Sequence, residues 1–172
     1  MTDAYLATMV RLACELASGR GATLYVVDGP VLRPLIVYNL PKEYIEGVGP
    51  VLIGTQCCGR AVEHKKPWIV RDMLADPLFI DGRAGAEASP IRAAFSVPVL
   101  DKERAIASLA CHFDQRHEPT KLDIERNEVF AKLIAITLGS RKPETAAEPL
   151  FSFAEKLPLR IVSLPGSGTP VE

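Results

Sequence analysis

Apolar residues recur along the chain at two different spacings, and each spacing predicts its own kind of element. From Ala4 to Ala17 they follow the three-to-four-residue repeat of a helix. β-Branched and aromatic residues fill Thr23–Val27 and Val31–Tyr38, on either side of an Asp28–Gly29 turn. The first quarter of the sequence therefore predicts a helix followed by a strand hairpin, with Pro34 marking an edge position or a bulge.

The middle of the chain alternates short regular elements with longer connections. Asn39–Gly54 is rich in Gly and Pro and is interpreted as a connection. Thr55 is placed to cap a helix that ends near Lys65, and Trp68–Val70 follows as a short strand. Asp72–Gly85 shows no clear period, and we interpret it as a long ordered loop with a helical turn. Long loops within a compact domain are usually functional.

Two strands and a helix complete the periodic part of the sequence. Arg92–Leu100 and Arg104–Phe113 predict a second hairpin. Thr120, with Asp123 three residues later, approximates a capping box that begins the last helix, and Gly139 ends it. The predicted buried stripe of this helix consists of Leu122, Val129, Phe130, Leu133, Ile134 and Thr137.

This order of elements predicts an α+β domain over residues 1–139. Strands joined by short turns form an antiparallel sheet of five or six strands, and the first and last helices pack together on one of its faces. From Ser140 the composition becomes rich in proline, so residues 140–172 are predicted to be a disordered tail or a linker. Apolar residues within it, Ile161 and Val162 among them, leave docking on the domain open.

Composition narrows the class of protein. Hydrophobic residues make up 48% of the 172, enough for a sizeable core, and the formal net charge is -1. This near-neutral balance argues against nucleic acid as a partner, and no charge run or apolar segment suggests a membrane, so we expect a cytoplasmic protein. The four cysteines form no C-x-x-C pair, and the Cys and His spacing predicts no metal site.

Four sequence segments, in their order along the chain, carry a family resemblance: "IGTQCCGRAV", "KPWIVRDMLADPLF", "IRAAFSVPVL" and "IASLACHF". Together with the order of elements, they resemble the GAF domain over about residues 1–140. The resemblance implies a small-molecule sensor in signal transduction, with a ligand pocket under loops near residues 40–55 and 72–90. It specifies neither ligand nor cofactor, because fold alone does not determine function.

One enzymatic branch of the family, the free methionine-(R)-sulfoxide reductases, resembles this chain at Cys58–Gly59. That branch has a further cysteine in the roof loop, whereas residues 72–90 contain none here. It also has a pocket glutamate where this chain has Ala94. We therefore expect a non-enzymatic sensor, with a divergent reductase or a cysteine-based redox sensor as alternatives.

Cys57 and Cys58 fall in the first turn of a predicted helix. Unpaired N–H groups at that position stabilise a thiolate and lower its pKa, which motivates the redox alternative. The contrasting interpretation is that Cys58 is a small apolar plug beside the sheet, because free cysteine is among the most buried residue types.

The remaining pocket candidates come from strands and from the loop that follows Trp68–Val70. Ser108 and His112 share one face of their strand, and Ser96 lies beside them on the neighbouring strand. This face is predicted to line the pocket, unless the histidine is solvent-facing or internally bonded. Asp72 and Arg92 are candidates for the pocket rim, and the alternatives are that each is one half of a surface ion pair or an anchor for the loop backbone.

Ligand binding is predicted to shift the packing of the two terminal helices. Exposed apolar positions on Ala4–Ala17 and Thr120–Leu138 make a homodimer through a helical bundle the expected partner arrangement. A third hypothesis is a purely structural dimerisation module, whose pocket is filled by its own side chains.

Overall fold

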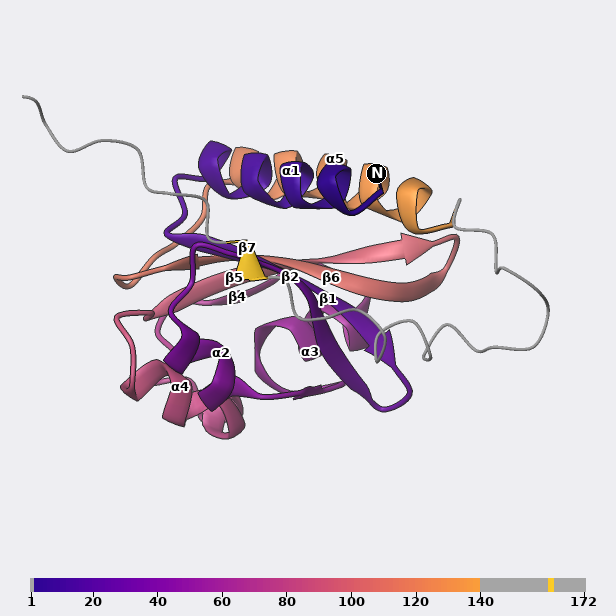
Figure 1. Cartoon of the computed structure of the whole chain (residues 1–172). Coiled ribbons are helices and arrows are strands. Elements are labelled where there is room, and N and C mark those ends of the chain that lie inside the picture. The colour runs from indigo at the N-terminus through magenta and orange to yellow at the C-terminus, as the bar shows by residue number, and fades with distance from the viewer. Residues whose placement is uncertain (1, 140–160, 163–172) are drawn as a thin grey trace, which may run out of the picture.

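The computed structural model describes residues 2–139 and 161–162, in which a sheet lies between two unequal layers of helices (Figure 1). Two long helices, α1 and α5, lie side by side on one face, as predicted. Shorter helices cover the other face. The helices are α1 (Thr2–Leu16), α2 (Lys42–Val48), α3 (Gln56–His64), the 3₁₀ helix η1 (Pro77–Gly82), α4 (Arg83–Glu87) and α5 (Lys121–Gly139).

Six antiparallel strands form the sheet in the order β3-β2-β1-β6-β5-β4, which confirms the predicted α+β architecture. A two-residue seventh strand pairs in parallel with the end of β2. The register of β1 and β2 shifts by one residue beside Pro34, the predicted bulge, because proline has no N–H to donate. The strands are β1 (Gly21–Asp28), β2 (Val31–Tyr38), β3 (Val51–Leu52), β4 (Trp68–Val70), β5 (Ala93–Asp101), β6 (Arg104–Phe113) and β7 (Ile161–Val162).

The core beneath the two long helices is apolar. Val10 of α1 and Ile134 of α5 pack on Leu24, Phe95 and Leu109 of the central strands. The alternation of side chains along a strand sends this set to the helix layer and leaves the intervening residues for the opposite face. The opposite face of the sheet is where the candidate site lies.

The predicted buried stripe of α5 is wrong for three of its six residues. Ile134 is buried and Phe130 and Thr137 are half-buried, whereas Leu122, Val129 and Leu133 are exposed. The helix carries apolar residues on more than one face, so helical periodicity could not identify the side that packs on the sheet. The capping box is confirmed, since Thr120 N–H donates to Asp123 Oδ2 (2.9 Å) and Asp123 N–H donates to Thr120 Oγ1 (3.2 Å).

Two predicted connections contain regular structure. Residues 39–54 hold α2 and β3, and the predicted loop after Asp72 holds η1 and α4. Asp76 begins η1 by accepting a hydrogen bond from Leu78 N–H (2.8 Å). These helices have only five to seven residues, too few for an apolar period to emerge. We call α2, η1 and α4 together the lid.

The lid helices approach each other closely through two glycines. A Cβ atom on Gly47 of α2 would lie 2.5 Å from the Cα of Gly85 in α4, so no larger residue fits without a backbone shift.

Thr55 occupies the cap position of α3, but its hydroxyl donates to Leu52 O (3.0 Å) and not to the helix, so the predicted side-chain cap is wrong. Within the described residues, every helix is too short or too polar to cross a bilayer. The predicted tail 140–172 lies outside the described residues, apart from β7.

Candidate functional site

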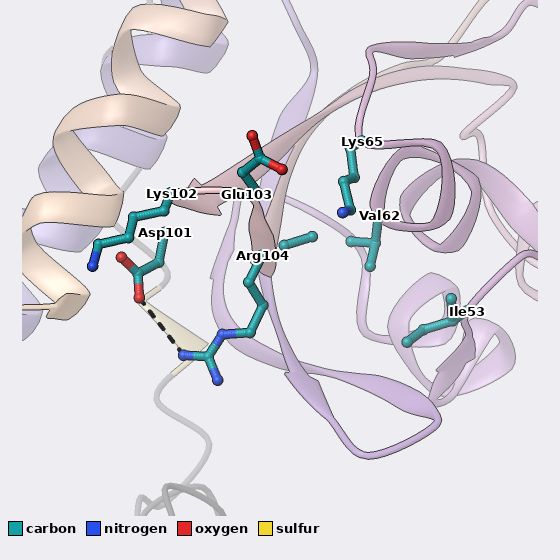
Figure 2. Close-up of a pocket in the computed structure, with 8 residues that line it drawn as sticks. Ile53, Val62, Lys65, Asp101, Lys102, Glu103 and Arg104 are labelled. Atoms are coloured by element: carbon teal, nitrogen blue, oxygen red, sulfur yellow. Dashed lines mark ion pairs between the residues drawn. The ribbon is translucent and has the colours of Figure 1, made fainter.

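The larger of two notable hollows is an open depression of about 740 Å³ beside the β5–β6 hairpin (Figure 2). Lys65 at the end of α3 borders it, and Asp101 and Arg104 of the hairpin form an ion pair across 3.6 Å. Figure 2 shows Asp101 and Arg104 pointing toward each other, whereas Glu103 points the other way. Exposed charges that pair with each other or point apart are screened by water and make a poor binding site.

The second hollow is an enclosed cavity between the sheet and the lid. Its free space is about 10 Å³, enough for the centre of one water molecule. Apolar walls come from Val48, Val51 and Phe79. The polar walls are Tyr25, Tyr44, Gln56, Cys57, Cys58 and His112.

His112 joins the sheet to the lid across this cavity. Its Nε2 lies 3.1 Å from Thr23 Oγ1 of β1, and its Nδ1 lies 3.2 Å from the hydroxyl of Tyr44 in α2. The two rings meet edge to face, with centroids 5.3 Å apart. Burial lowers the pKa of His112 to about 3, because the imidazolium would lose its hydration. The ring is therefore neutral near pH 7, with one nitrogen donating and the other accepting.

The two adjacent cysteines of α3 are buried neutral thiols. Cys57 Sγ donates to Trp68 O (3.3 Å), and burial raises its pKa well above the ordinary value. Burial also raises the pKa of Cys58, although hydrogen bonds with Ser96, Ser108 and Thr23 act in the opposite direction. The lowered pKa expected at a helix start is wrong here, because desolvation exceeds the effect of the helix.

Ser96 and Ser108 lie beneath Cys58 and not in the cavity wall. Both side chains are fully buried and hydrogen-bonded to each other across β5 and β6, and Ser96 Oγ also donates to Leu109 O (3.3 Å). Their hydroxyls satisfy one another and the thiol above them. They support the cavity floor without facing a ligand.

Asp72 and Arg92 are paired with each other at the base of the lid. Arg92 donates to Asp72 Oδ1 (3.0 Å), Arg116 donates to Oδ2 (2.6 Å), and the Leu74 N–H donates to Oδ1 (3.1 Å). Desolvation acts to raise the pKa of Asp72, but these hydrogen bonds outweigh it and hold the pKa below its usual value. The pair anchors the loop that leads into η1 and does not line the cavity.

A second ion pair attaches the lid to α3. Arg60, which is almost fully buried, donates to Asp76 Oδ2 (2.8 Å) and also to Gln56 O. The guanidinium also lies over the Trp68 ring, 5.1 Å from its centroid. Asp76 begins η1, so this contact fixes the start of the lid relative to the first turn of α3.

Sequence reasoning placed three residues in the cavity wall, Cys57, Cys58 and His112, and missed the other six. Gln56 directly precedes the cysteines, and Tyr25 sits two residues from Thr23 on the same face of β1, so both positions carried a usable signal. Tyr44 had none, because it belongs to a helix that the sequence did not reveal. Among the described residues, no cluster of His, Cys, Asp and Glu is arranged to hold a metal ion.

Comparison with known proteins identifies the fold. Residues 2–138 match the GAF domain family, and no curated protein matches the chain. The GAF domain of a phosphoenolpyruvate-protein phosphotransferase from Coxiella burnetii has a TM-score of 0.69 at 14% identity, covering 80% of this chain and 82% of that one.

Two further solved structures represent other roles on the same fold. A domain assigned to a two-component sensor histidine kinase of Sinorhizobium meliloti 1021 has a TM-score of 0.65 at 12% identity, covering 77% of this chain and 88% of that one. The free methionine-R-sulfoxide reductase of Neisseria meningitidis, solved with its substrate, has a TM-score of 0.62 at 19% identity. The match covers 81% of this chain and 78% of that one. Identities this low establish the fold alone. The match over residues 2–138 and the shared fold together place this chain in the GAF domain family.

Proposed function

We propose that this GAF domain is a regulatory module that takes up a small molecule between the sheet and the lid. The observation that carries the proposal is the polar character of an enclosed, fully buried cavity wall. A pocket filled for structural reasons alone would be lined by apolar side chains, because each buried polar group costs free energy unless it is paired. Here six of the nine lining residues carry polar or thiol groups.

Entry of anything larger than water requires the lid to move. The lid consists of three helices of five to seven residues, shorter than the helices that cover the other face. Short helices with few buried apolar contacts open at a lower free energy than the core of a domain. Among the described residues, Tyr44 of the lid contacts His112, and two ion pairs, Asp76 with Arg60 and Asp72 with Arg92, hold the chain that leads into η1.

One strand connects the cavity to the long helices. His112 faces the cavity from β6, while its neighbour Cys111 points to the other face and donates to Asn127 Oδ1 of α5 (3.3 Å). Asn127 in turn donates to Ala13 O of α1 (3.4 Å). A ligand that displaces Tyr44 from His112 therefore acts on a strand that is hydrogen-bonded to α5 and, through Asn127, linked to α1. This contiguous set of contacts supports signal transmission to α1 and α5.

The two long helices would deliver the signal to a second copy of the chain. Leu122, Val129 and Ile136 of α5 are 50%, 55% and 68% exposed and are spaced seven residues apart. Tyr5 and Leu12 of α1 repeat this spacing and are also exposed. Apolar residues at seven-residue spacing on a solvent-facing helix surface are typical of a helical-bundle interface.

Light scattering after size-exclusion chromatography tests the dimer. The wild-type chain is expected to elute with twice the mass of one chain, and Ile136→Glu to elute as a monomer with unchanged circular dichroism. Glu128→Lys on the same helix is the control and is expected to leave the mass unchanged. A monomeric wild type at micromolar concentration would contradict the proposed interface.

Thermal unfolding with a panel of cell metabolites tests ligand binding. A ligand at 100 times its dissociation constant stabilises a protein by about 2.7 kcal/mol, which raises the melting temperature by about 8 °C for a domain of this size. Val48→Phe, which fills the cavity from α2, is expected to abolish the shift, whereas Ile80→Phe on the exposed face of η1 retains it. A panel in which no compound raises the melting temperature of the wild type would favour the purely structural module.

Including methionine sulfoxide and dithiothreitol in the panel separates the sensor from the reductase. We expect no turnover, because burial raises the pKa of both Cys57 and Cys58. Residues 72–90 also supply no further cysteine. Reduction of the sulfoxide that is lost in Cys58→Ser would overturn the proposal and make the chain an enzyme.

A further inference from the structure

One donor in the cavity wall has no partner. Gln56 is 2% exposed and lines the cavity, and its Nε2 forms no hydrogen bond within the described part of the chain. An unpaired buried amide is costly, and native proteins retain such groups where a ligand, an ion or a bound water completes them. Gln56 lines the cavity and its Nε2 is buried, so a molecule in the cavity is the candidate for the missing acceptor.

The backbone holds Gln56 in an unfavourable conformation. Its φ angle is +52°, in the left-handed region that residues with a Cβ rarely adopt, and its carbonyl accepts a hydrogen bond from Arg60. The lid also leaves room for the side chain, because a Cβ on Gly82 would lie 2.6 Å from Gln56 Oε1. These contacts fix the amide under the end of η1, at the place where the lid closes on the sheet.

The cavity wall carries no ionised group among the described residues. His112 is neutral near pH 7 because burial lowers its pKa to about 3. Burial raises the pKa values of Tyr25 and Tyr44, as it does for the two lining thiols. Arg60 and Asp76, whose charges act on the lining residue Cys57, pair with each other. A charged ligand would lose its hydration here and find no counter-charge.

We propose that Gln56 is the recognition donor of this cavity and that its amide nitrogen donates to the carbonyl-type oxygen of a small uncharged organic molecule. This assignment rests on the proposed function and adds to it the chemical class of the ligand. Tyr44 and His112, which also line the cavity, provide the second polar contact, since a ligand that lifts the lid takes the place of their mutual hydrogen bond. Anionic and cationic metabolites are excluded by the same neutral wall.

Nitrogen-15 NMR of the full chain tests the assignment with two probes of nearly identical shape, acetamide and acetate. The sequence contains only four side-chain amides, those of Gln56, Gln115, Asn39 and Asn127, so their signals are easily separated. Gln56→Leu assigns the signal of interest, and Gln115→Leu, on the exposed surface, is the matched control. Acetamide is expected to shift the Gln56 signal with saturation, whereas acetate at equal ionic strength shifts none of the four.

Gln56→Leu is also expected to weaken the acetamide response of the His112 ring about fivefold to tenfold, the effect of one hydrogen bond. The melting temperature of this variant without ligand should not fall, because the amide nitrogen that it removes has no hydrogen-bond partner among the described residues. A Gln115→Leu chain should behave as wild type in both measurements.

Several outcomes would overturn the assignment. Equal shifts from acetate and acetamide would exclude the neutral class, and an unchanged acetamide response in Gln56→Leu would exclude the role of this residue. A lack of response to either probe would mean that the cavity holds an internal water only. In each case the metabolite panel, run on the same wild-type chain, still decides separately whether the domain binds a ligand.

Discussion

Replacing His112 by glutamine tests the neutral, buried state of the cavity wall. The pKa of His112 is about 3 in the folded chain and about 6.5 when the ring is in water. Because the folded value is the lower one, the unfolded chain binds more protons between these two pH values. The contribution of the neutral His112 ring to the stability of the folded chain is therefore complete above about pH 6.5 and is lost progressively as the pH falls toward 3.

The expected size of this loss follows from the same two pKa values. Each pH unit below the unfolded pKa costs about 1.4 kcal/mol, so lowering the pH from 7 to 5 removes about 2 kcal/mol of stability. Between pH 7 and pH 5 this loss of stability depends only on the pKa of His112 in the unfolded chain, because the pKa in the folded chain lies well below 5. Most carboxylates remain ionised at pH 5, so they add little to the difference.

Urea unfolding at pH 7 and at pH 5 measures the effect. The free energy of unfolding of the wild type is expected to fall by about 2 kcal/mol more than that of His112→Gln, whatever the absolute stability of the variant. His64→Gln, an exposed position in α3, is the control and should retain the wild-type pH dependence. Equal losses in the wild type and in His112→Gln would show that the ring is protonated or solvated when folded, and the argument for an uncharged wall would fail.

Three further predictions concern the lid and the thiols. Gly47→Ala should force α2 from α4 and speed amide hydrogen exchange in residues 42–48 and 83–87, whereas Gly139→Ala, with open space around it, should not. Asp72→Asn should lower the free energy of unfolding by about 1–3 kcal/mol at pH 7, by leaving two arginines without their carboxylate, while the exposed Asp101→Asn changes it by less than about 0.5 kcal/mol. All four thiols should resist iodoacetamide in the native chain and react in urea, and rapid alkylation of the native chain would restore the redox-sensor hypothesis.

The layered fold could be predicted from the sequence because its long helices and strands show a clear repeat of apolar residues. Strands β1, β2, β5 and β6 each run eight to ten residues, and their turns carry recognisable signals. α1 and α5 are likewise long enough to show a helical repeat. For the lid, the resemblance predicted covering segments near residues 40–55 and 72–90, and the sequence predicted a helical turn after Asp72, but α2 and α4 were missed. Helices of five to seven residues span less than two turns, and their packing depends on a contact between Gly47 and Gly85, which are 38 residues apart in sequence.

The candidate site was predictable only where it lies on the long strands and at the marked helix start. The position of His112 was predicted from alternation along β6, and the positions of Cys57 and Cys58 from the predicted helix start at Thr55. Their protonation states were not predictable, because desolvation depends on the lid that covers them. Asp72 and Arg92 were expected at the rim but pair with each other, an arrangement that only tertiary distances reveal.

Amide hydrogen exchange with the most stabilising metabolite of the panel tests most directly where a ligand binds. We predict slower exchange in α2, η1 and α4, and a smaller change in α5 around Asn127, with no change at the β5–β6 hairpin tip. Protection confined to the open depression around Lys65 and that hairpin tip, with the lid unaffected, would contradict binding between the sheet and the lid.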